Sequence, residues 1–331
     1  MKGPPARSIH VSRSHVHYGW SNATPPVITV ASGRQITLET QDASDGQVVP
    51  GASAQTIAAL DFARVNPITG PVFVEGAKPG DVLKVDILEV NAGTYGWTAN
   101  IPGFGLLADE FPDPWVYIWD LHTRLATLGS GIEVPLEPFC GVIGVAPATA
   151  GTLSVGPPTH VGGNMDVRQL TAGATVYLPI EVDGALFGVG DGHGAQGDGE
   201  VCGTGIEMPL TVTTRLTVQR GRSIRGPQFE ISRALERRAS ALSGYYVTTG
   251  IDADLMESAR DATRQMILHL ADRHRLGQYE AYALCSVAMD LRISEIVNSP
   301  NWLVSAFMPN DVFTSLRRPQ STRGRRSGPD Q

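Results

Sequence analysis

The stretch Lys78-Pro-Gly-Asp-Val-Leu-Lys-Val-Asp-Ile87 contains a turn that leads directly into a run in which apolar and polar residues alternate. Proline and glycine favour the turn, and alternation with a period of two is typical of a half-buried β-strand. The same arrangement recurs at residues 31–40 and 171–180, where Gly33 and Gly173 precede the alternating runs. The recurrence predicts strands that belong to β-sandwich or barrel-like units.

Two periodicities divide the chain. Before residue 230, most of the 37 glycines and 23 prolines separate short runs of Val, Ile, Leu and Thr, which indicates strands. After Gly250 the apolar residues follow a helical period. We expect one helix between Asp252 and Gly277, and a second from Gln278 to Val297. The predicted fold class is therefore α+β and β-rich, with C-terminal helices packed on the strands of the first 230 residues or so.

The chain is expected to have one main region with an extension at each end. Residues 1–14 form an N-terminal arm, and residues 15–315 form the main region, β-rich over 15–230 and helical over 250–300. Residues 316–331 carry five arginines among Ser, Pro and Gly, which is typical of a flexible basic tail.

The length, composition, charge and cysteine content of the chain exclude several classes of protein. A chain of 331 residues with 42% hydrophobic content can bury one large core or two medium ones. A formal charge of −7 argues against a nucleic-acid partner. No apolar run is long enough for a membrane span. The three widely spaced cysteines, without a CxxC pair, argue against a disulfide framework and favour a reducing cytoplasm.

The segment Phe187-Gly-Val-Gly-Asp-Gly-His-Gly-Ala-Gln-Gly-Asp-Gly-Glu200 differs from the rest of the chain. Six of its fourteen residues are glycine, and polar side chains of the kind that bind metals or substrates lie between them. Glycine lets the backbone bring such groups close together, at an entropic cost that a plain turn seldom carries. We interpret this segment as an active-site loop.

Asp191 and His193 have the spacing of two metal ligands. Residues two apart in an extended segment project to the same side, so the carboxylate and the imidazole can converge on one cation. Glu200 either completes the site or acts as its base. The imidazole favours zinc, whereas the alternation of Asp with Gly also resembles a structural calcium loop.

Three further segments carry candidate residues. Asn164 and Asp166 repeat the two-residue spacing just before another predicted strand, although such pairs commonly close turns. Asp45 and Gln47 follow the predicted strand at 31–40. His17 lies two residues after another histidine and before Trp20, which makes it a candidate for substrate binding.

These motifs resemble the acetamidase/formamidase family, over about residues 15–310. Gly194 is a departure, because the family pattern has alanine at that position. The resemblance implies a β-rich fold with added helices, a bound divalent ion, and hydrolysis of formamide or acetamide to a carboxylate and ammonia. The segments that carry it are Trp20 with Thr24–Val27, Asp42–Gln47, Asn66–Val74, Cys140–Pro147, Gly163–Asp166 and Gly190–Glu200.

The resulting hypothesis is a metal-dependent amide hydrolase in which a metal ion polarises the carbonyl group and activates a water molecule. Glu200 would take the proton of the water and return it to the departing nitrogen, with Asp191 and His193 as its catalytic partners. The candidate metal ligands are Asp191, His193, Asp45, Asn164, Asp166 and Glu200. The candidate substrate contacts are Gln196, His17 and Gln47.

Two alternatives stay open at the level of sequence. One is a nucleophilic Cys140, and the other is a non-catalytic β protein that binds a small ligand. Phe104 and Trp115, on the loop at 101–120, fit either a cover over the pocket or anchors in the core. The apolar C-terminal helices also lead us to expect a homo-oligomer.

Overall fold

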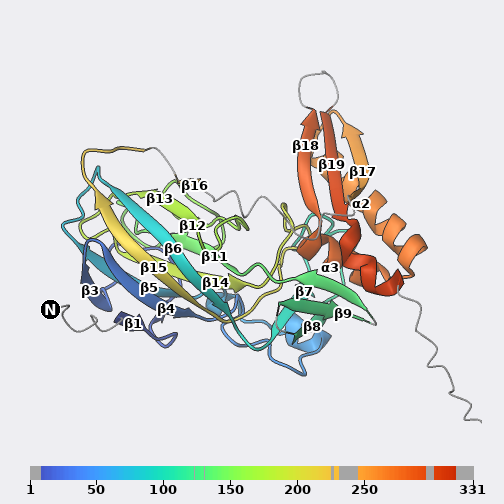
Figure 1. Cartoon of the computed structure of the whole chain (residues 1–331), viewed down its shortest axis with the longest axis horizontal. Coiled ribbons are helices and arrows are strands. Elements are labelled where there is room, and N and C mark those ends of the chain that lie inside the picture. Colours follow the sequence, from blue (N-terminus) through green and yellow to red (C-terminus); the bar gives the residue numbers. More distant parts are fainter. Residues whose placement is uncertain are drawn as a thin grey trace, which may run out of the picture.

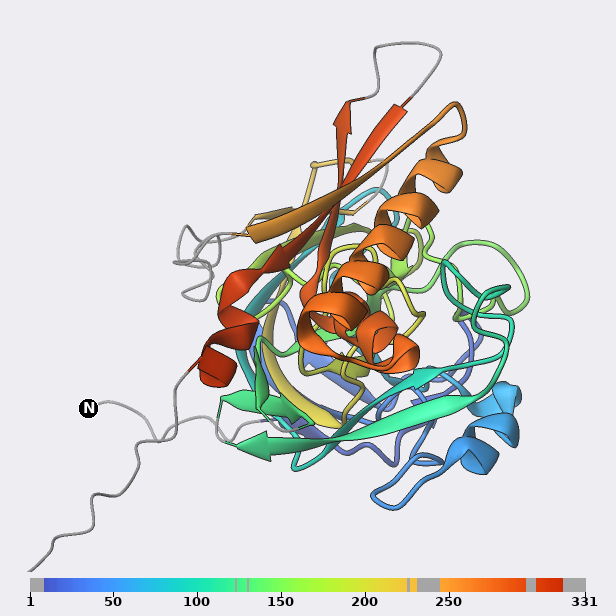
Figure 2. The same ribbon diagram turned by 90° about the vertical axis from the view of Figure 1, so that its right-hand side faces the viewer.

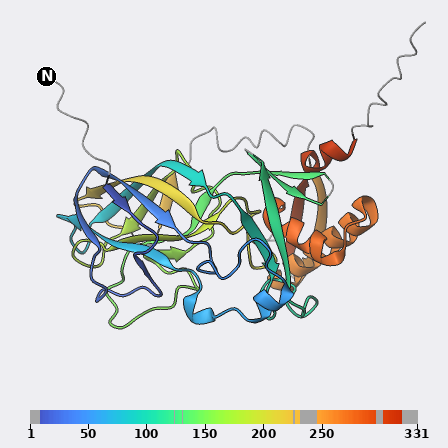
Figure 3. The same ribbon diagram turned by 90° about the horizontal axis from the view of Figure 1, so that it is seen from below.

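The computed structural model describes residues 9–122, 124–129, 131–224, 227–230, 245–295 and 302–317. An elongated β-sandwich forms one part of the molecule, and a smaller part with the two long helices adjoins one end of it (Figure 1). Viewed from below, the two parts lie side by side along the long axis (Figure 3). Residues 1–8 of the expected arm and 318–331 of the expected tail lie outside the described residues.

The first sheet of the sandwich contains all three of the turn-and-strand segments that the sequence predicted. They form β4, β6 and β13, which confirms the prediction of strands there. Neighbouring strands are antiparallel except for the parallel pair β1 and β4. In pairing order the strands are β1 (Ile9–Val11), β4 (Arg34–Thr40), β15 (Leu210–Gln219), β6 (Val82–Ala92), β13 (Thr175–Pro179) and β16 (Gln228–Glu230).

The second sheet faces the first across a shared apolar core. Leu83 and Val85 of β6 belong to the same buried cluster as Phe187 and Val189 of the second sheet, and none of the four side chains is exposed. The strands in pairing order are β12 (Gly162–Asn164), β11 (Phe139–Gly144), β14 (Phe187–His193), β5 (Ile68–Glu75) and β2 (Val16–His17), and β3 (Ile28–Ala31) also pairs with β5. The β-rich sandwich predicted from the sequence is confirmed.

The smaller part contains two more sheets and the helices. One sheet has the order β10 (Ile132–Pro135), β9 (Leu125–Leu128), β8 (Trp115–His122) and β7 (Gly96–Asn100), and the other has the order β17 (Tyr245–Asp252), β19 (Trp302–Pro309) and β18 (Asp290–Glu295). The helices are α1 (Ala54–Ala58), α2 (Leu255–His274) and α3 (Gln278–Ala288), with 3₁₀ turns η1 (Phe62–Arg64) and η3 (Asn310–Arg317). None of the helices in the described ranges is long and apolar enough to cross a membrane.

Helix α2 lies against β17 and β19, as the side view shows (Figure 2). Its buried residues Ala262, Met266 and Leu270 recur at helical spacing, so the predicted apolar face is its packing face. The cap is Asp254 rather than the expected Asp252: its side chain accepts hydrogen bonds from the first-turn amides of the helix.

The expectation that the second helix continues to Val297 is wrong. Helix α3 ends at Ala288, and the chain continues as β18, in which Leu291 lies opposite Ala306 of β19. The apolar residues after Ala288 satisfy a strand period as well as a helical one. Pairing with β19, which comes later in the chain, therefore decides the conformation.

The segment from Ala195 to Met208 connects the two parts of the molecule. It leaves the sandwich at the end of β14 and contributes Val201, Cys202 and Ile206 to the apolar core that also contains α3. The loop that the sequence marked as functional is therefore held between two cores rather than exposed at a surface.

Candidate metal centre

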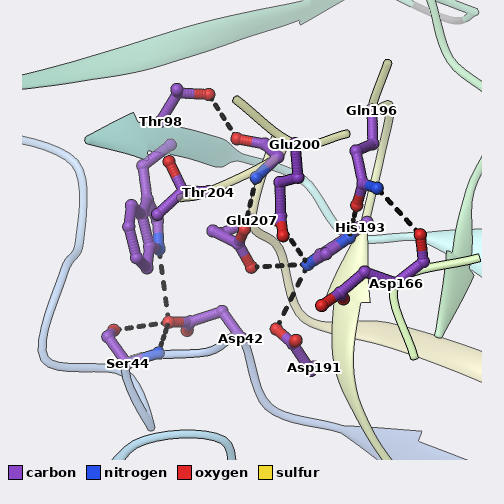
Figure 4. A network of polar contacts seen from close by, with 12 residues as sticks. Asp42, Ser44, Thr98, Asp166, Asp191, His193, Gln196, Glu200, Thr204 and Glu207 are labelled. Carbon is purple, nitrogen blue, oxygen red and sulfur yellow. Dashed lines mark hydrogen bonds and ion pairs between the residues drawn. The ribbon is translucent and has the colours of Figure 1, made fainter. Parts of the chain in front are cut away.

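Five side chains meet at the end of β14, and we call them the carboxylate–imidazole cluster (Figure 4). Two come from β14 itself, one follows β12, one lies in the loop after β14, and one lies shortly before β15. The segments 190–200 and 163–166, which are separated in the sequence, therefore lie together. The members are Asp166, Asp191, His193, Glu200 and Glu207.

The imidazole of His193 is the centre of the cluster. Its Nε2 atom is 3.1 Å from Glu207 Oε2, 3.3 Å from Asp191 Oδ1 and 3.8 Å from Glu200 Oε1. The side chain is almost fully buried, with 1% of its surface exposed. Phe139 packs edge-on against the ring and helps to fix its plane.

Gln196 determines which nitrogen of His193 carries the proton. Its Nε2 donates to the backbone oxygen of Asp166 at 2.9 Å, so its Oε1 is the atom that lies 2.8 Å from His193 Nδ1. An amide oxygen only accepts, and Nδ1 must therefore be protonated. In its neutral form the ring would then present the lone pair of Nε2 to a cation held by the carboxylates, which is the arrangement of a histidine ligand oriented by a neighbouring hydrogen bond.

Three members of the cluster have a strained backbone. The φ angles of Asp166, Asp191 and Glu200 are 49°, 52° and 39°, in the left-handed region that residues other than glycine seldom adopt. Each such residue costs about 1–3 kcal/mol and persists where the surroundings impose it, most often at functional sites. At Asp191 the strain falls where the apolar run of β14 ends and the cluster begins.

The cluster holds more negative charge than its buried surroundings favour. Burial and the neighbouring carboxylates raise the pKa of Asp166 to about 6 and that of Glu207 to about 8, and raise the pKa of Glu200 well above its usual range. Burial alone would lower the pKa of His193, but Glu207 and Asp191 raise it well above 6.5. Burial would raise the pKa of Asp191, but His193 holds it below its ordinary value. A proton or a metal ion is needed to balance this charge.

The oxygen atoms of the cluster fit a cation. Asp166 Oδ1 is buried and has no hydrogen-bond partner in the described part of the chain, while the buried atoms Asp191 Oδ1 and Glu207 Oε2 both face the single nitrogen His193 Nε2. Ligand atoms of Asp166, Asp191 and His193 lie within 4.8 Å of one another, as do those of His193, Glu200 and Glu207. Buried oxygens without donors are expected where a metal ion supplies the missing partner.

Gly141 of β11 leaves the space in which these atoms meet. A Cβ atom at this position would lie 2.5 Å from Asp166 Oδ1 and 2.8 Å from Asp191 Oδ2, closer than van der Waals contact allows. Its neighbour Cys140 points into the sandwich core instead, where burial raises the pKa of the thiol to about 12. A thiol with this pKa is a weak nucleophile, so the geometry disfavours the alternative based on Cys140.

A cavity of about 470 Å³ opens beside the cluster. Asp166, Asp191, Glu200 and Glu207 line it on the polar side, together with Asn164. The amide nitrogen of Asn164 donates to the Gly156 backbone oxygen, while its Oδ1 is buried without a partner in the described chain. Asn164 is thus at the wall of the cavity, as a candidate for substrate or metal contact.

Three residues singled out from the sequence lie away from the cluster and do not line the cavity. Asp45 pairs with Arg64 at 2.6 Å and accepts a hydrogen bond from Tyr18. Gln47 binds the backbone of Asp61 through both ends of its amide. His17 donates from Nδ1 to the backbone of Gly19.

Glu207 is the member of the cluster that sequence reasoning missed. It lies in the run Gly205-Ile-Glu-Met-Pro-Leu210, between two fully buried apolar residues, and 1% of its surface is exposed. A single carboxylate within an apolar run is the signal that could have identified it, because a buried charge needs a partner. The backbone of Glu207 forms isolated β-bridges with His193 and with Trp97, and these place the Glu207 side chain next to the imidazole.

Comparison of the sequence with known proteins identifies the family to which the chain belongs. The profile described as "Acetamidase/Formamidase family" matches residues 5–154 and 148–315. The chain belongs to the acetamidase/formamidase family. A formamidase from Methylophilus methylotrophus is 27% identical to it over 92% of this chain and 91% of its own length.

Two solved structures share the fold of this family member. A gamma lactamase from Delftia acidovorans has a TM-score of 0.85 at 26% identity, over 92% of this chain and 91% of its own. An acetamidase from Bacillus halodurans has a TM-score of 0.65 at 33% identity, over 94% of this chain and all of its own.

Arg168 joins the two loops that carry Asp166 and Glu200. Its Nε donates to Asp198 at 2.9 Å, and its Nη2 lies 3.2 Å from Asp290, whose side chain is 1% exposed. Asp198 is therefore bound to Arg168 and not to the cluster. Because Asp198 lies two residues before Glu200 and Arg168 two residues after Asp166, this ion pair holds the two halves of the site together.

Replacing Gly141 with alanine is expected to reduce metal content to less than half and kcat/KM by about 10²-fold, since the new methyl group displaces two ligand carboxylates by about 1 Å. The checks are metal analysis and amide turnover. The control is Gly277→Ala, where a Cβ meets nothing nearer than 3.5 Å. Normal metal content in the Gly141 variant would contradict the assignment of the cluster.

Replacing Arg168 with methionine is expected to lower the free energy of unfolding by roughly 3 kcal/mol, because buried Asp290 loses its nearest cation. It should also lower kcat/KM, since Glu200 is less firmly held. Denaturant unfolding and initial rates measure both effects. The control Lys78→Met breaks an exposed pair with Asp183 and should cost less than about 0.5 kcal/mol. Equal losses in the two variants would refute the role of Arg168.

Proposed function

We propose that the chain is a metal-dependent amidohydrolase that converts a small amide and water to a carboxylate and ammonia. The observation that carries the proposal is the position of His193 Nε2, which lies 3.3 Å from Asp191 Oδ1 and 3.1 Å from Glu207 Oε2, two buried carboxylates at the wall of a cavity. The relatives described as formamidase and acetamidase support the choice of an amide as substrate. A homo-oligomer and a cytoplasmic location stay predictions of the sequence.

His193, Asp191 and Asp166 are the residues that we assign to a divalent ion, with Glu207 beside them. One imidazole and several carboxylates suit zinc, which accepts both donor types, better than calcium, which prefers oxygen alone. When bound, such an ion polarises the amide carbonyl and lowers the pKa of a coordinated water. Gln196 keeps the histidine in the tautomer that this binding requires.

Glu200 is the group that we assign to proton transfer. Burial and the nearby carboxylate of Asp166 raise its pKa well above the usual range, which brings it closer to the pKa suited to accepting and returning a proton near neutral pH. The amide nitrogen must leave as ammonia, so the proton taken from water is returned to it as the C–N bond breaks. The carbonyl carbon keeps the oxygen of the water and becomes the carboxylate.

A second candidate function is hydrolysis of a cyclic amide. The structural neighbour described as a gamma lactamase has the same fold over nearly the whole chain. The bond to be cleaved and the atoms involved are the same, and the cavity of about 470 Å³ has room for a ring. Assays with a linear amide and with a lactam distinguish the two candidates.

Replacing Glu200 with glutamine is expected to lower turnover by 10²-fold or more while metal content is retained, because glutamine cannot accept a proton. Replacing His193 with alanine should lower both. Ammonia release from formamide and acetamide, paired with metal analysis, provides the measurement. The control is Asp183→Asn, which alters only an exposed ion pair with Lys78, away from the cluster and the cavity, and should change neither. Loss of metal from the Glu200 variant would make Glu200 a ligand, and full activity would rule out its assigned role.

The metal-free protein is expected to lose stability as the pH rises from about 5 to 8. A group with a raised pKa in the folded state stabilises the fold below its unfolded pKa, and this contribution is lost as the pH rises through the folded value. Glu207, with a pKa near 8 against an ordinary 4.5, and His193 both act in this direction. The melting midpoint should fall by about 10 °C over this range, and zinc should restore it at pH 8.

Thermal unfolding at several pH values, with a chelator or with zinc, tests this expectation. The control Glu207→Gln should flatten the pH dependence of the metal-free protein, since it removes the carboxyl group whose pKa burial raises from 4.5 to about 8. A midpoint that is constant or rises between pH 5 and 8 without metal would mean that the carboxylates are not crowded as described.

A further inference from the structure

The cavity is larger than formamide or acetamide requires. Its volume is about 470 Å³, within the range of about 300–1,000 Å³ for sites that bind drug-sized ligands. A molecule with three or four non-hydrogen atoms fills the space of only a few waters, at about 30 Å³ each. Besides the carboxylates and a few uncharged polar residues such as Asn164 and Thr204, the wall contains a group of apolar side chains: Leu60, Phe62, Val65, Ile101, Phe104 and Val155.

Two phenylalanines that contribute to this wall stack on each other and are half exposed. Phe62 begins η1 and Phe104 lies in the loop between β7 and β8, and their ring centroids are 5.4 Å apart with planes inclined by 6°. They are 49% and 51% exposed. Large apolar side chains grouped at a cavity and open to solvent indicate a surface that is covered when a ligand binds.

Both rings are carried by firmly held turns. The side-chain amide of Gln47 hydrogen-bonds both backbone groups of Asp61, just before Phe62. Asp45 accepts hydrogen bonds from Arg64, two residues after Phe62, so the turn at 61–64 is held at both ends. The turn that carries Phe104 packs against the continuation of the Glu200 loop, where Leu106 N donates to Val201 O at 2.8 Å. Asp45 and Gln47, which the sequence marked as site residues, therefore hold the turn that carries Phe62 and do not themselves line the cavity.

We propose that Phe62 and Phe104 form the acyl-binding wall of the site and that the preferred substrates are primary amides with a flat apolar acyl group, such as an aromatic carboxamide. This inference rests on the proposed function. Since that reaction releases ammonia, the nitrogen carries no substituent, and any bulk that fills the cavity belongs to the acyl side. The amide group lies at the carboxylate–imidazole cluster and the ring contacts the phenylalanines.

The first test compares kcat/KM for benzamide and acetamide. The ratio should exceed about 10 in the unaltered protein, because each methylene-sized group held in an apolar pocket changes specificity by about 10-fold or more. Phe62→Ala and Phe104→Ala should each lower the ratio about 10-fold. The matched control is Phe229→Ala on β16, an aromatic residue that is 46% exposed and does not line the cavity. It should leave the ratio unchanged.

The second test measures binding with little turnover, by calorimetric titration of the Glu200→Gln variant with benzamide and with acetamide. We expect at least 10-fold tighter binding of benzamide, and loss of that difference when Phe104→Ala is added to the same variant. Turnover of acetamide with no preference for benzamide in either test would overturn the acyl-binding wall and leave the proposed function intact. Preferential binding of benzamide with no turnover of any amide would support the wall and overturn the proposed function.

Discussion

The structure depends on one arrangement that is unfavourable by itself: four carboxylates gathered around the buried imidazole of His193. Each carboxylate raises the energy of the others in a region with little water, as the raised pKa values of Asp166, Glu200 and Glu207 record. A bound divalent cation would offset this repulsion, because each carboxylate could then coordinate the positive charge. The cluster is therefore a site built for a positive charge, and much of the surrounding fold serves to keep it assembled.

Several features far apart in the sequence serve this purpose. Gln196 links the imidazole to the backbone of Asp166, so the ring and the loop after β12 are set together. Arg168 ties that loop to the one that carries Glu200, and it does so through Asp198 and Asp290, outside the cluster. The loop itself lies between the sandwich core and the helical core, which limits its motion. Strain at three positions of the cluster, Asp166, Asp191 and Glu200, is tolerated because these contacts hold the backbone on both sides.

Local patterns in the sequence predicted the parts of the fold and site that depend on local geometry. Strand alternation located β4, β6 and β13, and the two-residue spacing placed Asp191 beside His193. These local patterns could not predict which distant segments of the chain contact one another. Glu207 was missed because its partners come from β14 and β7. Asp45 was predicted as a metal ligand and Gln47 as a substrate contact, although both hold the turn that carries Phe62. The segment of β18 was predicted as helix because its pairing partner β19 lies further along the chain.

The central claim is that His193 and the carboxylates around it bind one catalytic cation. A crystal structure of the zinc-loaded protein, with anomalous diffraction recorded on both sides of the zinc absorption edge, tests it directly. We predict an anomalous peak within about 2.0–2.2 Å of His193 Nε2 and of oxygens from Asp191 and Asp166. A peak elsewhere, or none at the cluster while the protein is fully loaded with zinc, would contradict the account.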